Sequence, residues 1–322
     1  MMLKVGVPEM IDRALHAHLP QDVHIEVLPA EMQHPVDIDF WIVPPYPKPA
    51  EAMWQQLRGV RVAQSVLAGV DWLLRLVPRE VTVCDARGVH DISTAEWAVT
   101  ATLASLKYLP LYGQVQRAAE WKRRSEATAH FARVHGDDRS YYPPVMLEDL
   151  HGKRVLIVGY GSIGSKIEQL MQPFGVQVDR IARTAREGVA SIDQLPALLP
   201  QADVIVLIVP LTEETRGLIG APQLAAMKQG ALLVNAARGP VVDTDALIAA
   251  LETGHIRAAI DVTDPEPLPD GHPLWSAPNL ILTPHVGGSS PQFMARAIQL
   301  AGQQIRRMQA GEPLENIVTG DY

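Results

Sequence analysis

One glycine-rich segment, Gly159-x-Gly161-x-x-Gly164, has residue types and spacing that suit the binding of a phosphorylated ligand. Residues 155–158 before it are apolar and of β character, and residues 165–171 after it have helical spacing. In such a strand, turn and helix, the first glycine permits the sharp turn, the second lets a pyrophosphate approach the backbone, and the third lets the helix pack on the strand. The N–H groups at the helix start attract phosphates. The segment therefore predicts a dinucleotide site.

Three side chains able to bind anions or transfer protons come just after predicted strands in the second half of the chain. They are Arg238 in N-A-A-R-G, Glu266 in D-V-T-D-P-E-P and His285 in T-P-H-V-G-G. In open α/β sheets, ligands bind outside the carboxyl ends of the strands. A single loop arginine, glutamate or histidine is usually a solvated residue, but the joint placement of these three favours a shared site beside the dinucleotide.

A regular alternation of strands and helices positions these residues. Predicted strands of the second half cover residues 155–158, 176–181, 204–209, 231–235, 258–261 and 280–282. One helix between them opens at Asp243, a good N-cap, and closes at Gly254, a good C-cap. Six strands in one parallel sheet make a complete doubly wound, or Rossmann, nucleotide-binding domain.

The first hundred residues also alternate strands and helices, which is typical of a parallel α/β unit. Strands are predicted at residues 3–7, 23–28, 38–43, 60–65 and 81–84, helical patches at 9–18, 49–57 and 70–76, and an extended loop over the proline cluster 44–49. The segment 65–71 leads from a strand through Gly69 into a helix. Its N–H groups either hold a small anion such as a carboxylate, or the glycine serves the turn alone.

Two further segments define the domain organisation. A long helix is expected at residues 94–107 with Ser93 as its N-cap, followed by a polar excursion over residues 116–142 that has no sustained period. A helix at 291–308 is expected to return to the first half. We therefore expect a smaller, flavodoxin-like α/β substrate domain of residues 1–93 and 291–322, into which an α/β nucleotide-binding domain of residues 94–290 is inserted.

Composition excludes several function classes. The 322 residues are 47% hydrophobic and 20% charged, as in ordinary globular proteins, and the net charge of -8 disfavours binding to nucleic acid or to an anionic membrane. The single cysteine, Cys84, cannot form an internal disulfide, which fits a reduced, cytoplasmic setting. Lys4 and Glu9 interrupt the first apolar residues, so no signal peptide is expected, and no apolar run is long enough to span a bilayer. No metal is expected.

The glycine loop and the segments that carry Arg238, Glu266 and His285 resemble, in this order and spacing, the D-2-hydroxyacid dehydrogenase family. Leu67-Ala68-Gly69-Val70-Asp71, which precedes them, shares the likeness, so the resemblance spans nearly the whole chain. The resemblance implies a discontinuous substrate domain, a central nucleotide-binding domain, an active site in the cleft between them and a homodimer built on the nucleotide-binding domains. It also implies that hydride passes between a nicotinamide cofactor and C2 of a small 2-oxo acid or 2-hydroxy acid.

The resemblance assigns roles to the three residues at the strand ends. Arg238 matches the arginine that binds the substrate carboxylate and carbonyl, since a planar guanidinium can bond both oxygens. His285 matches the general acid and base, and Glu266 matches the carboxylate that favours its imidazolium form. Backbone N–H groups around Ala68 and Gly69 would hold the substrate carboxylate. Leu67 stands where many members carry glycine, which would narrow the pocket or alter the substrate it admits.

Cofactor contacts are implied along the same sheet edge. The residues concerned are Gly159, Tyr160, Gly161, Ser162, Ile163, Gly164, Pro210, Thr215, Ala236, Arg238, Asp261, His285 and Gly287. Two interpretations of Asp261 remain open: it lies on the nicotinamide side of the site, or it caps a loop through its own backbone.

The choice of nicotinamide cofactor depends on the end of the second strand. NAD enzymes of this type usually place an acid there to bond the ribose 2′-hydroxyl. Here the strand ends in Ala182-Arg183-Thr184-Ala185-Arg186, and the nearest acid, Asp179, sits within the strand. We favour NADP(H) over NAD(H), with Arg183, Thr184 and also Arg186 as ligands of the 2′-phosphate.

The preferred interpretation is an NAD(P)-dependent reductase of glyoxylate, hydroxypyruvate or a related 2-oxo acid. Oxidation of 3-phosphoglycerate ranks second, because the substrate-side loops show no dense basic cluster for a phosphate. A formate dehydrogenase is disfavoured, since that branch carries glutamine where Glu266 stands. From another class, a co-repressor or redox sensor would use the same fold to bind a dinucleotide, and turnover with 2-oxo acids would separate enzyme from sensor.

Overall fold

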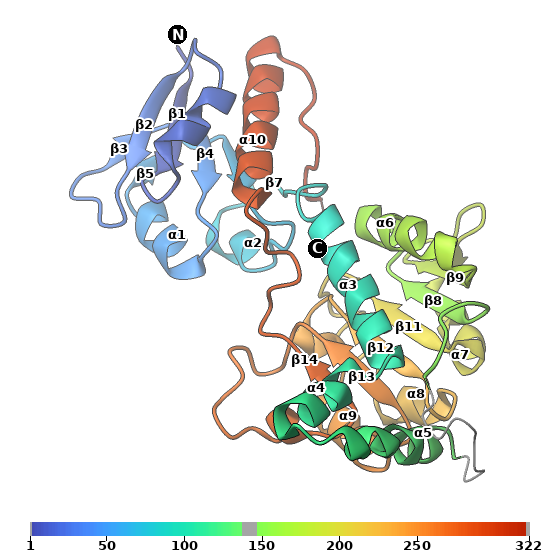
Figure 1. The fold of residues 1–322 in the computed structure, drawn as a ribbon. Coiled ribbons are helices and arrows are strands. Elements are labelled where there is room, and N and C mark those ends of the chain that lie inside the picture. The colour runs from blue at the N-terminus through green and yellow to red at the C-terminus, as the bar shows by residue number, and fades with distance from the viewer. Residues whose placement is uncertain (1, 137–146, 320–322) are drawn as a thin grey trace. The chain divides into compact units, whose positions relative to one another are not determined.

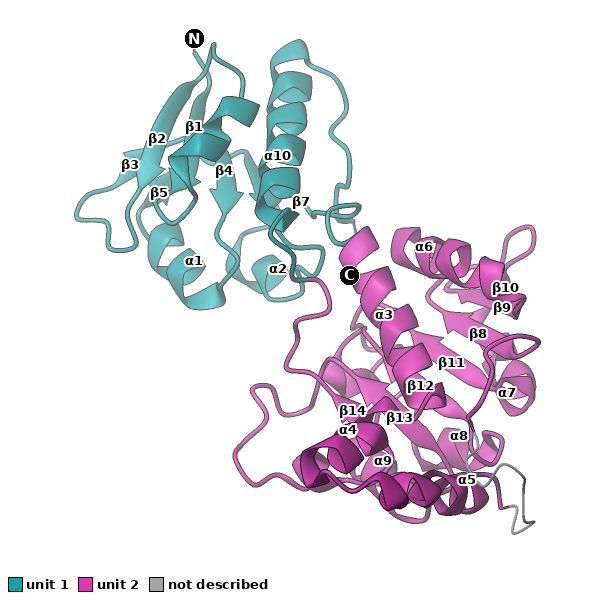
Figure 2. Cartoon of the chain, viewed as in Figure 1, with its two compact units in different colours: residues 1–91, 289–322 teal, residues 92–288 magenta. Residues whose placement is uncertain are grey.

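The computed structural model describes residues 2–136 and 147–319. The chain divides into two compact units, residues 1–91 with 289–322 and residues 92–288 (Figures 1 and 2). The boundaries expected from the sequence, at residues 93 and 291, fall two residues after these.

The first unit contains a five-stranded parallel sheet within the described residues. Its order is β2-β1-β4-β6-β7, which in chain order is the flavodoxin-like 2-1-3-4-5. The strands are β1 (Lys4–Pro8), β2 (His24–Leu28), β4 (Phe40–Val43), β6 (Val62–Ser65) and β7 (Thr82–Cys84), and β3 (Val36–Asp37) pairs with β5 (Leu57–Arg58) apart from them. The helices are η1 (Arg13–His18), α1 (Pro47–Trp54), α2 (Leu73–Leu76) and α10 (Phe293–Ala310).

The C-terminal helix α10 packs on this sheet, as the sequence predicted (Figure 1). Its buried residues Ala297, Ile298, Ala301 and Ile305 belong to one cluster with residues of β1. Gly302 permits the close approach of α10 to the end of η1, because a Cβ there would overlap the His18 carbonyl oxygen. Two local expectations were wrong: the patch 9–18 forms only the 3-10 turn η1, and α1 already begins inside the proline cluster. Proline suits the first turn of a helix, where its missing N–H has no partner to lose.

The second unit is built on a parallel sheet with the order β10-β9-β8-β11-β12-β13-β14 within the described residues. All six predicted strands are present as β8 (Arg154–Val158), β9 (Gln177–Ala182), β11 (Val204–Leu207), β12 (Leu232–Asn235), β13 (Arg257–Ile260) and β14 (Leu280–Leu282). The seventh, β10 (Ala190–Ser191), has two residues, too few for a periodic signal. The strand order reverses between β8 and β11, so this is a doubly wound sheet.

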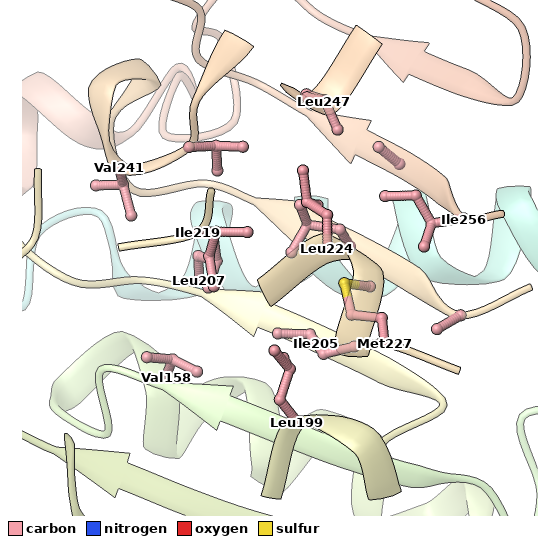
Figure 3. Packing of buried hydrophobic residues seen from close by; sticks show 14 of the residues in the cluster. Val158, Leu199, Ile205, Leu207, Ile219, Leu224, Met227, Val241, Leu247 and Ile256 are labelled. Carbon is pink, nitrogen blue, oxygen red and sulfur yellow. The ribbon is translucent and has the colours of Figure 1, made fainter. Parts of the chain in front are cut away.

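Alternate residues of the strands bury two separate cores, one on each face of the sheet. Leu156, Ile205 and Leu207 face a cluster with α8 (Ala221–Ala226) and α9 (Thr244–Glu252), which Figure 3 shows at close range. Val155 and Ile157 face the other cluster, with α3 (Asp91–Leu106) and α6 (Ser162–Met171). Each fully buried aliphatic side chain contributes about 1.5–3 kcal/mol, so helices on both faces hold the strand ends in fixed positions.

Most of the polar excursion is helical, against expectation. It forms α4 (Leu109–Ala118), η2 (Trp121–Ser125) and α5 (Glu126–His135), while residues 137–142 of the predicted range lie outside the described residues. The helix α3 also begins at Asp91, two residues before its expected N-cap. The remaining short helices are η3 (Gln172–Phe174), η4 (Ile192–Gln194), α7 (Leu195–Leu198), η5 (Leu199–Gln201), η6 (Gly239–Val241) and η7 (Pro273–Ser276).

A buried ionic cluster ties this helical segment to the sheet. Glu148, 6% exposed, accepts hydrogen bonds from Arg257 Nη1 at 2.8 Å, Tyr108 Oη at 3.0 Å and Lys153 Nζ at 3.1 Å. His135 Nε2 lies 3.1 Å from the same carboxylate. Within residues 2–136 and 147–319, no helix is both long enough and apolar enough to cross a bilayer.

Candidate active site

The glycine loop between β8 and α6 has the geometry of a phosphate cradle. Gly159 has φ +106°, and a Cβ on it would lie 2.5 Å from the Ile208 carbonyl oxygen. A Cβ on Gly164 would lie 2.7 Å from the Gly159 carbonyl oxygen, so this glycine allows α6 to pack on the loop. Around Gly161, no heavy atom of the described residues lies within 4 Å of the Cβ position. The loop therefore leaves open space at the start of a helix, where a pyrophosphate fits.

The end of β9 presents basic side chains. Arg183 and Thr184 are exposed there, and Arg183 Nε lies 4.0 Å from Glu214 Oε2 on the loop after β11. Asp179, the rival ribose ligand, pairs with Leu156 in mid-strand and accepts hydrogen bonds from Arg154, with Nη2 at 3.0 Å. Its carboxylate is therefore engaged within the strand rather than at the strand end.

The loop after β11 carries two of the predicted cofactor residues. Thr215 Oγ1 donates to the Pro210 carbonyl at 2.7 Å and accepts from the Thr212 N–H at 2.8 Å. On the next strand, Ala236 donates its N–H to the Leu207 carbonyl at 3.2 Å. These residues therefore lie at the carboxyl ends of β11 and β12, the strands that follow the glycine-loop strand in the sheet.

Arg238 is half-buried in a loop shaped by Asn235. The Asn235 side chain accepts from the Ala237 N–H at 3.0 Å and donates to the Arg238 carbonyl at 3.2 Å, and Arg238 Nη1 donates to the Ala237 carbonyl at 2.8 Å. The next residue, Gly239, lies directly against Thr263, whose carbonyl a Cβ would overlap. The segments that carry Arg238 and Glu266 are thus in backbone contact.

His285 and Glu266 form a hydrogen bond of 2.6 Å between Nδ1 and Oε1. Their side chains are 46% and 41% exposed. Burial opposes ionisation of Glu266, but the hydrogen bond and charge of His285, with a smaller contribution from Arg238, hold its pKa below the usual value. An ionised carboxylate only accepts hydrogen bonds, so Nδ1 carries the proton and Nε2 is the nitrogen that can exchange one with a ligand.

The backbone of His285 has φ +53°, a left-handed conformation that costs about 1–3 kcal/mol in a non-glycine residue and persists only where its surroundings impose it. Asp261, 4% exposed, supplies that constraint. Its carboxylate accepts from the Val286 N–H at 2.9 Å, the Gly287 N–H at 2.7 Å and Thr283 Oγ1 at 2.5 Å. Asp261 therefore anchors the loop that carries His285, while its predicted contact with a cofactor stays a prediction.

Sequence reasoning missed three residues that shape the site: Asn235, Gly239 and Thr283. Each sits within a segment that was identified: Asn235 bonds the backbone of the following turn, Gly239 allows a close backbone contact, and Thr283 donates to the Asp261 carboxylate. A signal existed for Asn235, since a polar residue at the last position of an apolar strand commonly bonds the following turn.

The predicted substrate loop belongs to the first unit. Leu67 donates its N–H to Ser65 Oγ at 2.9 Å and accepts from the Ala86 N–H at 3.0 Å. Leu67, Ala68 and Gly69 are each partly exposed. Their contact with a substrate stays a prediction.

A cavity lies at the opposite edge of the second unit's sheet from the glycine loop. It measures about 360 Å³ at the amino ends of β13 and β14, lined among others by Tyr108, Gln114, His130, Arg133 and Asn279. Burial lowers the pKa of His130 to about 4, so the imidazole there is neutral. No cluster of three or more histidine, cysteine, aspartate or glutamate residues suited to a metal ion occurs among residues 2–136 and 147–319.

Comparison with known proteins also indicates a dinucleotide-binding domain in the second unit. Residues 99–287 match the family model "D-isomer specific 2-hydroxyacid dehydrogenase, NAD binding domain". A glyoxylate/hydroxypyruvate reductase B from Citrobacter koseri is 35% identical over 74% of this chain and 72% of its own. A D-3-phosphoglycerate dehydrogenase from Methanocaldococcus jannaschii is 34% identical over 74% of this chain, which spans only 43% of that relative. The structure of a D-isomer specific 2-hydroxyacid dehydrogenase from Xanthobacter autotrophicus Py2, in complex with NADPH and MES, is 29% identical, with a TM-score of 0.78 and 98% of each chain covered.

Proposed function

Because the chain belongs to the D-isomer specific 2-hydroxyacid dehydrogenase family, we propose that it reduces small 2-oxo acids such as glyoxylate or hydroxypyruvate, and oxidises the corresponding D-2-hydroxy acids. It is an NAD(P)-dependent oxidoreductase that acts on CH–OH groups. The observation that carries the proposal is the 2.6 Å hydrogen bond between His285 and Glu266, on loops at the carboxyl ends of the sheet that also carries the glycine loop.

The proton chemistry follows from this pair. In reduction, His285 donates the proton on Nε2 to the carbonyl oxygen of the 2-oxo acid, and in oxidation it takes that proton back. Glu266 accepts the Nδ1 hydrogen bond throughout, which fixes the orientation of the ring and leaves Nε2 facing the ligand side. Arg238 binds the substrate carboxylate and carbonyl through its planar fork of donors. When bound, the nicotinamide supplies the hydride in reduction and accepts it in oxidation.

Residues of the glycine loop and of the neighbouring strand ends would hold the dinucleotide. Gly161 offers the open approach to the backbone, and the start of α6 offers N–H groups and the positive end of its dipole. Leu67, Ala68 and Gly69 would take the substrate carboxylate, as the family resemblance implies.

The substrate class is tested by comparing kcat/KM for glyoxylate, hydroxypyruvate and 3-phosphohydroxypyruvate under identical conditions. We expect the two unphosphorylated acids to be reduced more efficiently than the phosphorylated one. A clear preference for 3-phosphohydroxypyruvate would replace this proposal with a phosphoglycerate dehydrogenase.

Asp261→Asn is expected to lower kcat about 10- to 100-fold, because a small displacement of His285 removes much of the benefit of correct orientation. The amide cannot accept from Val286, Gly287 and Thr283 at once, as the carboxylate does. Steady-state kinetics with the fold checked by circular dichroism measures this. Asp264→Asn, an exposed acid of the same strand-end segment, is the matched control. Turnover of Asp261→Asn within about twofold of the unaltered protein would remove the anchoring role.

We also propose a preference for NADP(H) over NAD(H). Arg183 and Thr184 stand at the end of β9, and Asp179 is engaged by Arg154 instead of standing there to repel a 2′-phosphate. Arg183→Ala should lower kcat/KM for NADPH about 10- to 100-fold, because it removes a hydrogen bond between two charged groups. The kcat/KM for NADH should change little. Arg117→Ala, which removes an exposed arginine of α4, is the control. An unaltered protein that prefers NADH contradicts the proposal.

A homodimer in the cytoplasm is proposed on the family resemblance. The polar helical segment supports it, since Leu109 and Trp121 are exposed there by 57% and 78%, as expected of a surface that a second copy covers. Light scattering during gel filtration should give twice the chain mass of 35.2 kDa, and a mass of one chain would exclude the dimer.

A further inference from the structure

Tyr160, the second residue of the glycine loop, is fixed at both ends. Its N–H donates to the Ile181 carbonyl at 2.8 Å, so its backbone lies against the end of β9. Its hydroxyl donates to Glu168 Oε2 at 2.5 Å, and Glu168, a buried residue of α6, is also bound by Arg180, whose Nε lies 2.7 Å from Oε2. The guanidinium carbon of Arg180 also lies 5.5 Å from the centre of the Tyr160 ring, so Tyr160, Glu168 and Arg180 form one network that holds the ring in place. A glycine loop needs no aromatic residue at this position to make its turn, so the ring is free to serve a further contact.

Arg186 lies against this tyrosine. One of its Nη2 hydrogens is donated to the Tyr160 carbonyl, and its guanidinium carbon lies 5.8 Å from the centre of the Tyr160 ring, within the range of a cation–π contact. Arg186 also pairs with Val189 through two backbone hydrogen bonds, which close the turn between β9 and β10. The exposed side chain is therefore held at the glycine loop, a few residues from Arg183 and Thr184.

We propose that Tyr160 is a positioning residue for Arg186, which acts as a second cation for the 2′-phosphate of NADP(H). The proposal rests on the NADP(H) preference proposed above. A free arginine side chain loses rotamer entropy when a ligand orders it. Contacts with the Tyr160 carbonyl and ring restrict Arg186 beforehand, so less of that loss falls on the binding step.

A competing explanation places Arg186 on the pyrophosphate. That group is common to both dinucleotides, so such a contact would strengthen NADH and NADPH binding equally. The 2′-phosphate occurs only in NADP(H), so selective loss of one ligand class distinguishes the two explanations.

Isothermal titration calorimetry with adenosine 2′,5′-bisphosphate and with 5′-AMP tests the proposal without turnover. Tyr160→Leu should weaken binding of the bisphosphate about 3- to 10-fold, in line with the loss of a cation–π contact, and change 5′-AMP binding less than about twofold. Tyr160→Phe keeps the ring and should stay close to the unaltered protein. Arg186→Ala should show the same selective loss, and the double variant Tyr160→Leu/Arg186→Ala should bind no more weakly than Arg186→Ala alone.

Three results would overturn the role of Tyr160. The first is an equal loss of affinity for both ligands in Tyr160→Leu, and the second is an additive loss of affinity in the double variant. The third is the absence of a selective loss in Arg186→Ala, which would decide against the proposal even if Tyr160→Leu does not fold. An unaltered protein that binds both ligands equally removes the NADP(H) preference together with this role. Reduction of 2-oxo acids with NADH would still stand in that case, so the two failures are distinguishable.

Discussion

Replacement of His285 by glutamine is expected to lower kcat about 100- to 10,000-fold with folding intact, the range for loss of a positioned general acid and base. Glutamine can still hydrogen-bond to Glu266, but its amide cannot donate a proton to a substrate oxygen and recover it. The exposed position of His285, 46% accessible, means that its loss leaves no cavity in the core. Steady-state kcat with a saturating 2-oxo acid, together with the thermal melting curve, measures the effect.

The chain offers a matched control for this variant. His24 Nε2 lies 3.4 Å from Glu26 Oε2 on the exposed surface of β2, so it is a second histidine beside a carboxylate. His24→Gln should leave kcat unchanged. If His285→Gln retained turnover within about tenfold of the unaltered protein, the assignment of the acid and base would be wrong.

Glu148→Gln is expected to lower the free energy of unfolding by about 3–5 kcal/mol, because it leaves a buried cation without its partner. Arg257 is 2% exposed, and both of its terminal nitrogens donate to this carboxylate, at 2.8 and 3.3 Å. Asp149→Asn is the control. The Asp149 carboxylate is 85% exposed and pairs with Lys107, and such surface ion pairs contribute about 0–1 kcal/mol. Urea unfolding at neutral pH measures both variants, and a loss in Glu148→Gln no larger than in the control would contradict the account.

The same variant has a defined pH dependence. Burial opposes ionisation of Glu148, but His135, Arg257 and Lys153 outweigh it, and the pKa of this carboxyl is held well below its usual value of 4.5. A carboxyl whose folded-state pKa is depressed stabilises the fold above its unfolded pKa, and that stabilisation is lost as pH falls through the folded pKa. The difference between Glu148→Gln and the unaltered protein should therefore be full at neutral pH and shrink below about pH 4.5.

The strands and their ends were predictable because buried parallel strands leave continuous apolar runs, and the residues just beyond them are easily located. The glycine loop and the positions of Arg238, Glu266 and His285 after their strands followed from that pattern. Helices α4 and α5 were missed for the opposite reason. Their sequences show no sustained apolar period, and the contacts around Glu148 that tie Tyr108, before α4, and His135 of α5 to the sheet join residues distant in sequence.

The network behind the candidate site was equally invisible to sequence patterns. Nothing in the segment D-V-T-D-P-E-P reveals that Asp261 binds two N–H groups beyond His285, because those contacts join different strand ends. In the same way, Asp179 resembled a ribose ligand by its type and approximate position, and only the side chain of Arg154 shows that its carboxylate is engaged in mid-strand. Residue types indicated which side chains could do chemistry, whereas the long-range contacts that hold those side chains in place became visible only in the structure.

The most direct test of the central claim follows the absorbance of NADPH as glyoxylate or hydroxypyruvate is added to the purified protein, with NADH in parallel and chiral analysis of the product. We expect the cofactor to be oxidised only when the 2-oxo acid is present, and NADPH to be oxidised faster than NADH. Where C2 of the product is chiral, we expect the D-2-hydroxy acid. Binding of the dinucleotide without any such oxidation, with either cofactor, would contradict the central claim and indicate a dinucleotide sensor.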